Sequence, residues 1–324
     1  MKLTSREREI VDVLLKEPLI SQEELALRFG ISRSSAAVHI SNLMKKGIIL
    51  GKGYVFNKKA LVVVIGEVLL KIMVKQNDEN EKIDIEYGGF SAEVSRALAS
   101  FGMNTKILTV VGNDHLGSQI LSKLKTWEVD VSNVIKEQKY RTPRKIYLDK
   151  TLQFSEHIPD EIFIKAIEAR EWVFLNCDWL LVEEQYQELM SKKMTSKDEK
   201  LPGLCACRFI NDEVPEFLNQ YALVVLGVDN FQQLNKFSQI GLRLVQGGTQ
   251  NCIITDGSSI ILQNSEQASM DFALPPNQSF DSRTDLHLFL AGLVYGLSCG
   301  YPIRQALRIA IANACSQETD NRNT

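Results

Sequence analysis

The sequence predicts a small helical domain with a β-hairpin over residues 1–59 and a larger α/β domain, with a mainly parallel sheet, over residues 60–324. Capped helical segments followed by a Gly-Lys-Gly turn predict the first domain. An apolar run that ends at Gly66, followed by further apolar runs that alternate with helical patterns, predicts the second. A length of 324 residues is ample for both domains.

The composition is that of an ordinary globular protein, with 44% hydrophobic and 24% charged residues. No apolar run reaches about 18 residues, and charged residues follow the initial Met-Lys-Leu-Thr, so we expect a cytoplasmic protein without a membrane partner. The six cysteines lack paired C-x-x-C spacing and are expected to be reduced core residues. No metal site is expected, because metal-ligand spacing is also missing among His39, His115, His157 and His287.

Charge is distributed unevenly between the two predicted domains, which we call the head (residues 1–59) and the body (residues 60–324). The head holds 11 Lys and Arg against 6 Asp and Glu, a net charge of +5. The whole chain has a formal net charge of -3, so the body carries -8. A basic head on an acidic body predicts that the head has a polyanionic partner.

The first two helices of the head are predicted from their caps. Thr4 or Ser5 caps the first helix, whose apolar residues recur at spacings of three and four and which ends before Pro18. The second helix opens with the capping box Ser21-Gln-Glu-Glu24 and is closed by Gly30. The short turn that follows has the length and composition of the turn in a helix-turn-helix.

A third helix and a hairpin complete the head. Ser32 caps this helix, which runs from Arg33 to Lys46 and ends at a glycine. Two apolar stretches, 48–50 and 54–56, then flank the turn Gly51-Lys52-Gly53. Three helices followed by such a hairpin form a winged helix-turn-helix domain.

The third helix is the candidate DNA-reading element. Its predicted buried face consists of Ala37, Ile40, Leu43 and Met44. The N-terminal residues of a recognition helix approach base edges, whereas lysines at its far end and at a wing tip meet phosphates. We therefore expect double-stranded DNA as a partner, with base contacts from Arg33, Ser34 and Ser35. The other candidate contacts are His39, Asn42, Lys45, Lys46 and Lys52.

The head resembles the MarR- and DeoR-like winged heads of bacterial regulators, including the N-terminal extension found on some sugar or nucleoside kinases. This resemblance implies DNA binding and transcription regulation. In an alternative interpretation, Lys45, Lys46 and Lys52 only form a solvated face and the head docks another protein.

The strand pattern of the body begins with the apolar run from Ala60 to Gly66, which is typical of a strand buried on both faces of a parallel sheet. Further predicted strands are Ile107 to Val111, Val173 to Leu175, Gly203 to Cys207, Leu223 to Val228 and Cys252 to Thr255. Helical patterns between most of them predict helices on both faces of the sheet. Two polar-flanked stretches interrupt the alternation and predict a small β-lid: Lys71 to Tyr87 and Lys145 to Phe154.

Three ordered motifs lie in this body. The first begins with Gly88-Gly89 and ends at Gly102, the second runs from Val111 to Gly117, and the third, Asp281 to Gly292, reads D-S-R-T-D-L-H-L-F-L-A-G. They resemble the G-G-x-x-x-N-x-A-x-x-L-A-x-L-G, G-x-D-x-x-G and D-T-x-G-A-G-D-x-F-x-x-G signatures of the ribokinase-like (PfkB) carbohydrate kinases. The resemblance covers nearly all of the body and implies a ribokinase-like fold. In that family, ATP and magnesium support phosphoryl transfer to a hydroxyl.

The departures from these signatures fall on functional positions. His287 stands at the position of the family's catalytic aspartate, and Asp285 stands between Thr284 and Leu286, which replace two glycines that would approach a phosphate. Lys71 and Glu93 replace a sugar-binding aspartate and asparagine, and Gln233 replaces the acid of the family's N-x-x-E element. The resemblance therefore implies a degenerate ligand pocket that includes Lys71, Gly88, Gly89, Glu93, Gln233 and Asp285.

Lys71 and Glu93 are related changes, because an acid has become a base and an amide has become an acid in one pocket. We hypothesise an ion pair between them that either closes the old sugar pocket or adapts it to a charged ligand. In the alternative interpretation, both residues are exposed parts of the lid.

These observations predict a homodimeric transcriptional regulator. Its kinase-like body would serve for dimerisation and for sensing a sugar or nucleoside effector, with no cofactor. The alternative is an active sugar or nucleoside kinase that uses ATP and magnesium, with His287, or Asp285 in a shifted register, as the base. A third interpretation is a protein-docking module without either activity.

Overall fold

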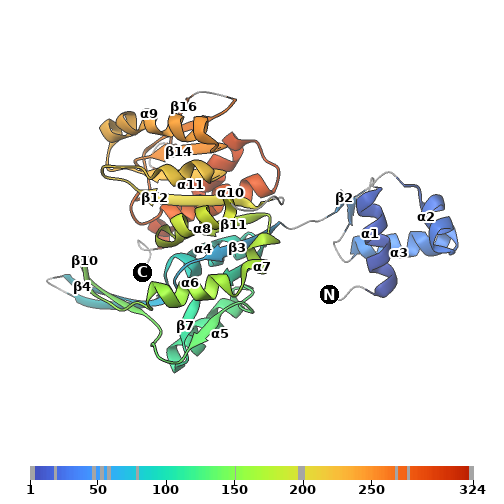
Figure 1. Cartoon of the computed structure of the whole chain (residues 1–324), viewed down its shortest axis with the longest axis horizontal. Coiled ribbons are helices and arrows are strands. Elements are labelled where there is room, and N and C mark those ends of the chain that lie inside the picture. Colours follow the sequence, from blue (N-terminus) through green and yellow to red (C-terminus); the bar gives the residue numbers. More distant parts are fainter. Residues whose placement is uncertain are drawn as a thin grey trace. The chain divides into compact units, whose positions relative to one another are not determined.

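The chain divides into two compact units, Met1–Lys59 and Ala60–Thr324. A computed structural model describes residues 4–17, 20–45, 49–51, 55–56, 60–77, 80–149, 151–195, 201–266, 269–275 and 278–320 (Figure 1). Lys46, Gly47 and Lys52, and with them the predicted wing tip, lie outside these residues.

The first unit is built from three helices and one antiparallel strand pair. The elements are α1 (Ser5–Lys16), α2 (Gln22–Phe29), α3 (Arg33–Lys45), β1 (Ile49–Gly51) and β2 (Val55–Phe56). Thr4 and Ser21 each head a capping box, with Glu7 and Glu24 as the reciprocal partners. Gly30 ends α2 at a φ of 60°, a left-handed conformation that favours glycine. The winged-helix prediction is confirmed.

The buried face of α3 differs in part from the prediction. Ala36, Ile40 and Leu43 are buried, at the helical spacing of four and three, and they pack with residues of α1 and α2. Met44 is instead 44% exposed, and Ala37 is only partly buried. Each of these two residues follows a buried one, and one step along an α-helix turns a side chain about 100° away from its neighbour.

The main sheet of the second unit has the strand order β16-β15-β14-β13-β12-β11-β3-β6 in the described residues. The strands from β14 to β6 run parallel, and β15 and β16 join at one edge in antiparallel register. Their bounds are β3 Leu61–Ile65, β6 Asn104–Leu108, β11 Trp179–Val182, β12 Gly203–Phe209, β13 Leu223–Gly227, β14 Asn251–Thr255, β15 Ser259–Asn264 and β16 Met270–Ala273.

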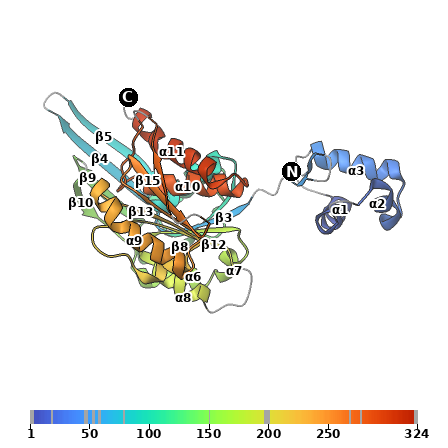
Figure 2. The ribbon, with the colours of Figure 1, turned by 90° about the horizontal axis from the view of Figure 1, so that it is seen from above.

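Helices cover both faces of this sheet (Figure 2). One face packs against α4 (Phe90–Ser100), α10 (Leu286–Ser298) and α11 (Ile303–Asp320). The other face packs against α6 (Asp160–Glu168), α7 (Glu171–Leu175), α8 (Gln187–Thr195), α9 (Phe231–Gly247), η1 (Glu184–Tyr186) and η2 (Glu216–Gln220). At the β6 edge, α5 (His115–Thr126) completes a smaller core.

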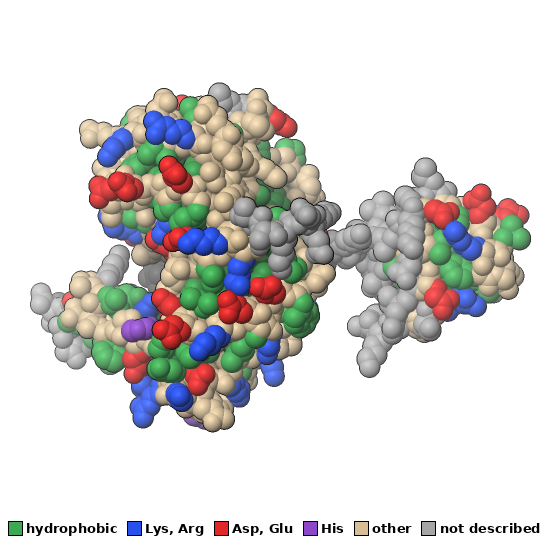
Figure 3. Space-filling model, in the orientation of Figure 1, with side chains coloured by type: hydrophobic (Ala, Val, Ile, Leu, Met, Phe, Trp, Pro, Cys, Tyr) green, Lys and Arg blue, Asp and Glu red, His purple; other side chains and the backbone are tan. Residues whose placement is uncertain are grey.

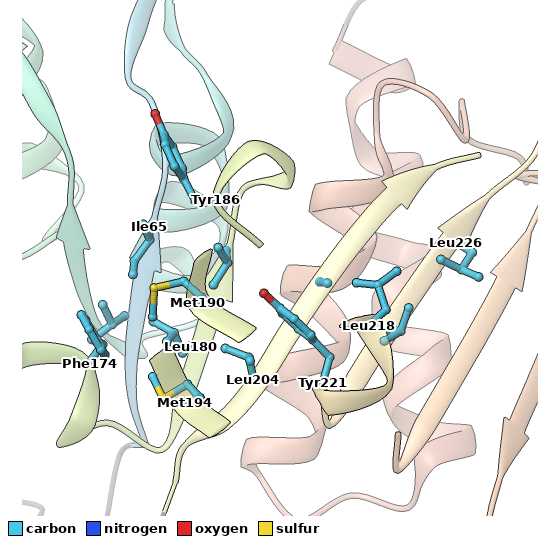
Figure 4. Packing of buried hydrophobic residues seen from close by; sticks show 14 of the residues in the cluster. Ile65, Phe174, Leu180, Tyr186, Met190, Met194, Leu204, Leu218, Tyr221 and Leu226 are labelled. Atoms are coloured by element: carbon cyan, nitrogen blue, oxygen red, sulfur yellow. The ribbon is translucent and has the colours of Figure 1, made fainter. Parts of the chain in front are cut away.

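Successive side chains along the strands point to opposite faces of the sheet and enter two apolar cores. Val62 and Val64 of β3 enter the core on the α10 side, whereas Val63 and Ile65 enter the core on the α8 side. Figure 4 shows Ile65 among the side chains of this second core, which includes Leu180, Met190 and Tyr221. Burial on both faces explains why the central strands read as continuous apolar runs. The predicted α/β class, with a mainly parallel sheet and helices on both faces, is confirmed.

Two of the predicted strands need correction. Val173 to Leu175 lies in α7, and the strand of this region is β11, which pairs with both β3 and β12. Short apolar runs do not distinguish a buried helix from a buried strand, because both show no alternation. Ile107 to Val111 is divided between β6 and β7 (Val110–Gly112), and β7 pairs with β8 (Ile135–Glu137) outside the main sheet.

The predicted lid is a four-stranded sheet in the order β10-β9-β4-β5. Its strands are β4 (Leu69–Asn77), β5 (Asn80–Gly88), β9 (Arg144–Leu148) and β10 (Thr151–Ser155). Because paired residues share one face, its two faces differ. Lys71 and Lys145 are register partners on one face, which we call the lysine face. The other, the apolar face, carries Ile72, Val74, Ile83, Ile85, Ile146, Leu148 and Phe154.

All six cysteines lie in the described residues and carry reduced thiols. Cys205, Cys207 and Cys252 are buried as predicted, but Cys299 is exposed, so the core prediction is wrong for this residue. Cys299 follows the last turn of α10, where an apolar-looking segment reaches the surface. None of the helices in the described ranges combines the length and apolar character needed to cross a lipid bilayer.

Candidate functional site

The candidate site of the body lies where the lid, α4 and α10 meet. Lys71 comes from β4, Glu93 from the first turn of α4, and His287 from the first turn of α10. Glu93 Oε1 accepts hydrogen bonds from Lys71 Nζ and from the backbone N–H of Gly89 (3.1 Å). Glu93 Oε2 lies 2.8 Å from His287 Nε2. The predicted Lys71–Glu93 ion pair is confirmed, and His287 joins it.

The Gly88-Gly89 step makes room for these contacts. A Cβ on Gly88 would lie 2.8 Å from Glu93 Oε1 and 2.8 Å from Lys71 Cδ. Gly89 has a φ of 93°, and a Cβ there would lie 2.7 Å from the carbonyl oxygen of Glu67. A side chain at Gly88 would displace the Lys71–Glu93 pair and one at Gly89 would meet backbone, so both glycines serve the chain's own contacts, without any reference to a ligand.

Glu93 is held as an anion. Burial alone would raise the pKa of its carboxyl, but the hydrogen bond with His287 and the charges of His287 and Lys71 together lower this pKa well below its usual range. A carboxylate can only accept, so His287 donates from Nε2 to it. That nitrogen is occupied, and Nδ1 is left as the atom through which His287 could accept a proton.

A pair of acidic residues, Glu67 and Glu183, lies beside this site and was missed by sequence reasoning. Lys145 Nζ, on the lysine face, is 3.6 Å from Oε2 of the buried Glu67. The backbone N–H of Glu67 donates to Glu183 Oε2 at 2.6 Å. Burial, together with the charge of Glu67, raises the pKa of Glu183 to about 7. The available signal was position, because Glu67 and Glu183 stand just beyond the carboxyl ends of β3 and β11.

The backbone donors of the loop before α10 are taken by the chain's own carboxylates. Asp281 Oδ1 accepts from the backbone N–H groups of Arg283 (2.7 Å) and Thr284 (3.3 Å). Asp285 Oδ2 accepts from the backbone N–H of Asp281, and Asp285 Oδ1 accepts from the Thr284 hydroxyl, each at 3.2 Å. Mainly because of burial, the pKa of Asp285 is raised. An incoming polyphosphate would meet two carboxylates and lack these donors, so the residues present do not fit ATP at this loop.

The same loop is fastened to the end of β13. Ser282 Oγ donates to the carbonyl oxygen of Val228 at 2.8 Å. The Arg283 guanidinium donates to Asp229 Oδ1 (2.6 and 3.2 Å) and stacks over the ring of Phe209, 3.9 Å from its centroid. These contacts fasten the loop to β12 and to the end of β13.

Gln233 has a structural role at the start of α9. Asn230 Oδ1 accepts from the backbone N–H of Gln233 (3.1 Å), and Gln233 Oε1 accepts from the backbone N–H of Asp229 (2.9 Å). This arrangement resembles a capping box, in which an amide serves as well as an acid. Among the described residues there is no group of three or more His, Cys, Asp or Glu side chains that could hold a metal ion.

The candidate DNA surface lies on α3. Arg33, Ser34 and Ser35 are exposed, whereas His39 and Asn42 are partly buried. Ser32 caps the helix, since its Oγ accepts from the backbone N–H of Ser35 at 3.1 Å. Lys45 is the last residue of α3, but its side chain, like Lys46 and Lys52, lies outside the described part. Sequence reasoning missed Val38, which is 58% exposed on the same helix.

Two family models match this chain. The one described as pfkB family carbohydrate kinase matches residues 59–151, and the one described as winged helix-turn-helix DNA-binding matches residues 3–49. Residues 59–151 therefore match the PfkB carbohydrate kinases, and they follow an N-terminal segment that matches winged helix-turn-helix domains. The predicted resemblance to PfkB kinases and the predicted winged helix-turn-helix are confirmed.

The comparison with individual proteins agrees with this assignment. The uncharacterized sugar kinase YeiI of Escherichia coli (strain K12) is 25% identical over 347 aligned positions, which span 96% of this chain and 93% of that protein. A ribokinase from Thermotoga maritima is 13% identical with a TM-score of 0.61, covering 79% of this chain and 92% of its own. A fructokinase with bound ATP from Xylella fastidiosa is 18% identical with a TM-score of 0.62, covering 79% and 91%. At such identities these two structures establish the fold alone.

Proposed function

We propose that this chain is a DNA-binding transcriptional regulator of the cytoplasm. Its winged head binds double-stranded DNA, and its PfkB-type body serves for dimerisation and for sensing a sugar or nucleoside, without phosphoryl transfer. The observation that carries this proposal is the arrangement of Glu93, whose two carboxylate oxygens are bound to Lys71, Gly89 and His287.

These contacts argue against catalysis in two ways. Lys71, Glu93 and His287 occupy the positions where the resemblance implied sugar ligands and a catalytic base, and here they bind one another. Nε2 of His287 donates to Glu93, so this nitrogen is not free to take a proton from a hydroxyl. A positioned general base contributes about 10²- to 10⁴-fold to a rate.

The loop before α10 supports the same conclusion. Asp281 holds two of its backbone donors, and Asp285 adds a second carboxylate. Loss of a single donor from an oxyanion-type hole costs about 10²- to 10³-fold in rate. Because several such donors are engaged, we expect phosphoryl transfer to be lost along with magnesium and ATP binding.

Charge favours the head as the nucleic-acid contact. The head has a net charge of +5, and the exposed start of α3 carries Arg33. On the face of the body visible in Figure 3, acidic and basic side chains are interspersed. We therefore assign DNA binding to the head and propose Arg33, Ser34, Ser35, His39 and Asn42 as its contacts, with Lys45, Lys46 and Lys52 at phosphates.

The apolar face of the lid supports the homodimer. Ile83 and Ile85 are 63% and 64% exposed there, and Phe154 is 49% exposed. A contiguous apolar sheet face of this kind is costly in water and marks an interaction surface. We propose that two copies of the chain bury this face against each other, so that two heads bind half-sites about one DNA turn apart.

The two faces of the lid provide a route from effector to DNA. The lysine face is joined to the rest of the body through Lys71–Glu93 and Lys145–Glu67. A sugar or nucleoside that competes for these groups moves the lid, and with it the apolar face on the opposite side. The spacing of the two heads then changes, because the ligand favours one of two arrangements of the dimer.

Selection of bound duplexes from a random DNA library tests this proposal on the intact chain. We expect a recurring sequence, with binding that weakens steeply as salt increases. Arg33→Ala should weaken binding to it, whereas Lys192→Ala, which removes an exposed charge of the body, should not. Failure to enrich any sequence, together with salt-independent binding, would contradict the proposal.

An active sugar kinase is the second candidate function. It is favoured by the 25% identity with the E. coli sugar kinase, which extends over 96% of this chain. In that case His287 would accept a proton at Nδ1, with Glu93 as its orienting carboxylate. Sugar-dependent ADP formation that disappears in His287→Ala would support this function.

A further inference from the structure

The exposed face of α3 carries a stripe of three residues, of which one, Val38, is apolar. Ser34, Val38 and Ser41 are spaced four and three residues apart, so they lie on one face of the helix, and all three are exposed. The opposite stripe, Ala36, Ile40 and Leu43, is buried. Val38 therefore lies at the middle of the surface that α3 presents outward, between two serines.

Exposure alone does not single out Val38, because scattered apolar residues are common on protein surfaces. Leu27 on α2 is 79% exposed, more than the 58% of Val38. Its position between two serines on the exposed face of α3 distinguishes Val38 from Leu27. The serine side chains end at their γ oxygens, so they do not reach past the two γ-methyl groups of Val38, which is 58% exposed. A valine in a helix is also nearly fixed at χ1, so little side-chain freedom is lost on contact.

Major-groove chemistry offers one partner for such a group. Base edges in the groove display hydrogen-bond donors and acceptors, and the C5 methyl of thymine is their apolar group. Asn42, one turn after Val38, has an amide of the kind that pairs with adenine N6 and N7. An apolar and an amide side chain one turn apart suit an A·T-containing step.

We propose that Val38 determines sequence specificity by contacting the C5 methyl group of a thymine in each half-site. This inference rests on the proposed DNA binding of the head and adds to it a residue and a base. It predicts that the methyl group, separately from the base pairing, contributes to affinity.

Replacement of thymine by deoxyuridine tests the inference, because it removes only that methyl group. A duplex selected by the intact chain is substituted one thymine at a time, and the Kd of each duplex is measured. We expect one thymine per half-site whose replacement weakens binding about fourfold, the value for one buried methyl group. Val38→Ala should bind the thymine and uracil duplexes equally.

Leu27→Ala is the matched control, since it truncates an exposed apolar residue outside the stripe. It should keep the full sensitivity to uracil. The inference is overturned if wild type binds every uracil duplex like the parent, or if Val38→Ala keeps the wild-type sensitivity. Absence of any salt-sensitive DNA binding overturns the proposed function as well, so the two failures are distinguishable.

Discussion

Glu93 Oε2 and His287 Nε2 lie 2.8 Å apart, although the two residues are separated by 194 positions in the sequence. The other oxygen of the same carboxylate accepts from Lys71 of the lid and from the backbone of Gly89. One partly buried anion thus joins the lid, α4 and α10. A ligand that enters between these elements must replace the hydrogen bonds of Glu93 or leave that charge unpaired.

Glu93→Gln should destabilise the body, because Lys71 and His287 lose the charge that faces them. The side chains of Glu93 and Lys71 are 18% and 26% exposed, so we expect a loss of about 2 to 4 kcal/mol in the free energy of unfolding. Urea unfolding at neutral pH measures this loss.

Glu213→Gln is a suitable control, since Glu213 is exposed on a loop and its replacement should change stability by less than about 0.5 kcal/mol. The stability difference between Glu93→Gln and wild type should also depend on pH. The pKa of Glu93 is lowered in the folded chain, so its contribution is present above the ordinary carboxyl range and is lost as the pH falls below it. Equal stability of Glu93→Gln and wild type at neutral pH would argue against the carboxylate's role.

Glu183 should show the opposite pH dependence. Its pKa is raised from 4.5 to about 7, mainly by burial, so the folded chain binds the proton more tightly than the unfolded chain. Its contribution to stability is therefore present below about pH 4.5 and is lost as the pH rises through about 7. Glu183→Gln stays neutral and keeps an oxygen acceptor for the Glu67 N–H.

This variant should be more stable than wild type above pH 7, by up to about 3 kcal/mol, and the difference should vanish in acid. Urea unfolding across a pH series gives the free energy of unfolding of wild type and of Glu183→Gln as a function of pH. Parallel curves over the whole range would mean that Glu183 titrates normally.

Ile83→Asp should dissociate the proposed dimer. Ile83 is 63% exposed on the apolar face, and a carboxylate there would be buried without a partner if two copies met. We expect a monomer by sedimentation, with weaker binding to a two-half-site DNA. Glu86→Lys on the lysine face is the control and should remain dimeric. A monomeric wild type would rule out this interface.

ATP with magnesium should leave the melting temperature of the intact chain unchanged. Asp281 and Asp285 bind three backbone N–H groups of the loop before α10 and place two carboxylates there, which opposes the binding of phosphates. Thermal melting with and without saturating nucleotide is the measurement. A ligand at 100 times its Kd would add about 2.7 kcal/mol of stability, and a shift of that size would favour the kinase.

The sequence predicted the architecture through its caps, glycines and apolar runs. Ser21 and Gly30 delimit α2 as expected, and the apolar run after Ala60 is β3. The predicted secondary structure was wrong where a buried segment showed no hydrophobic periodicity. Val173, for example, packs into the core from a helix. Ala37 was mistaken for Ala36 because two adjacent alanines give the same pattern.

The candidate site could be predicted only where a motif marked it. Lys71 and Glu93 stood at motif positions, so their ion pair was foreseeable. Glu67 and Glu183 belong to no motif. They meet because β3 and β11 are neighbours in the sheet, and the motifs do not predict the order of the strands. Asp281 likewise binds the backbone of Arg283 and Thr284, a contact that depends on local conformation.

Titration of the intact chain with a selected duplex and with a scrambled duplex tests whether this chain recognises a specific DNA sequence. A regulator should bind the selected duplex at least about 10³-fold more tightly. It should also lose affinity steeply between about 50 and 200 mM salt, as phosphate-bound counterions are released. Equal, salt-insensitive and weak binding to both duplexes would contradict the account.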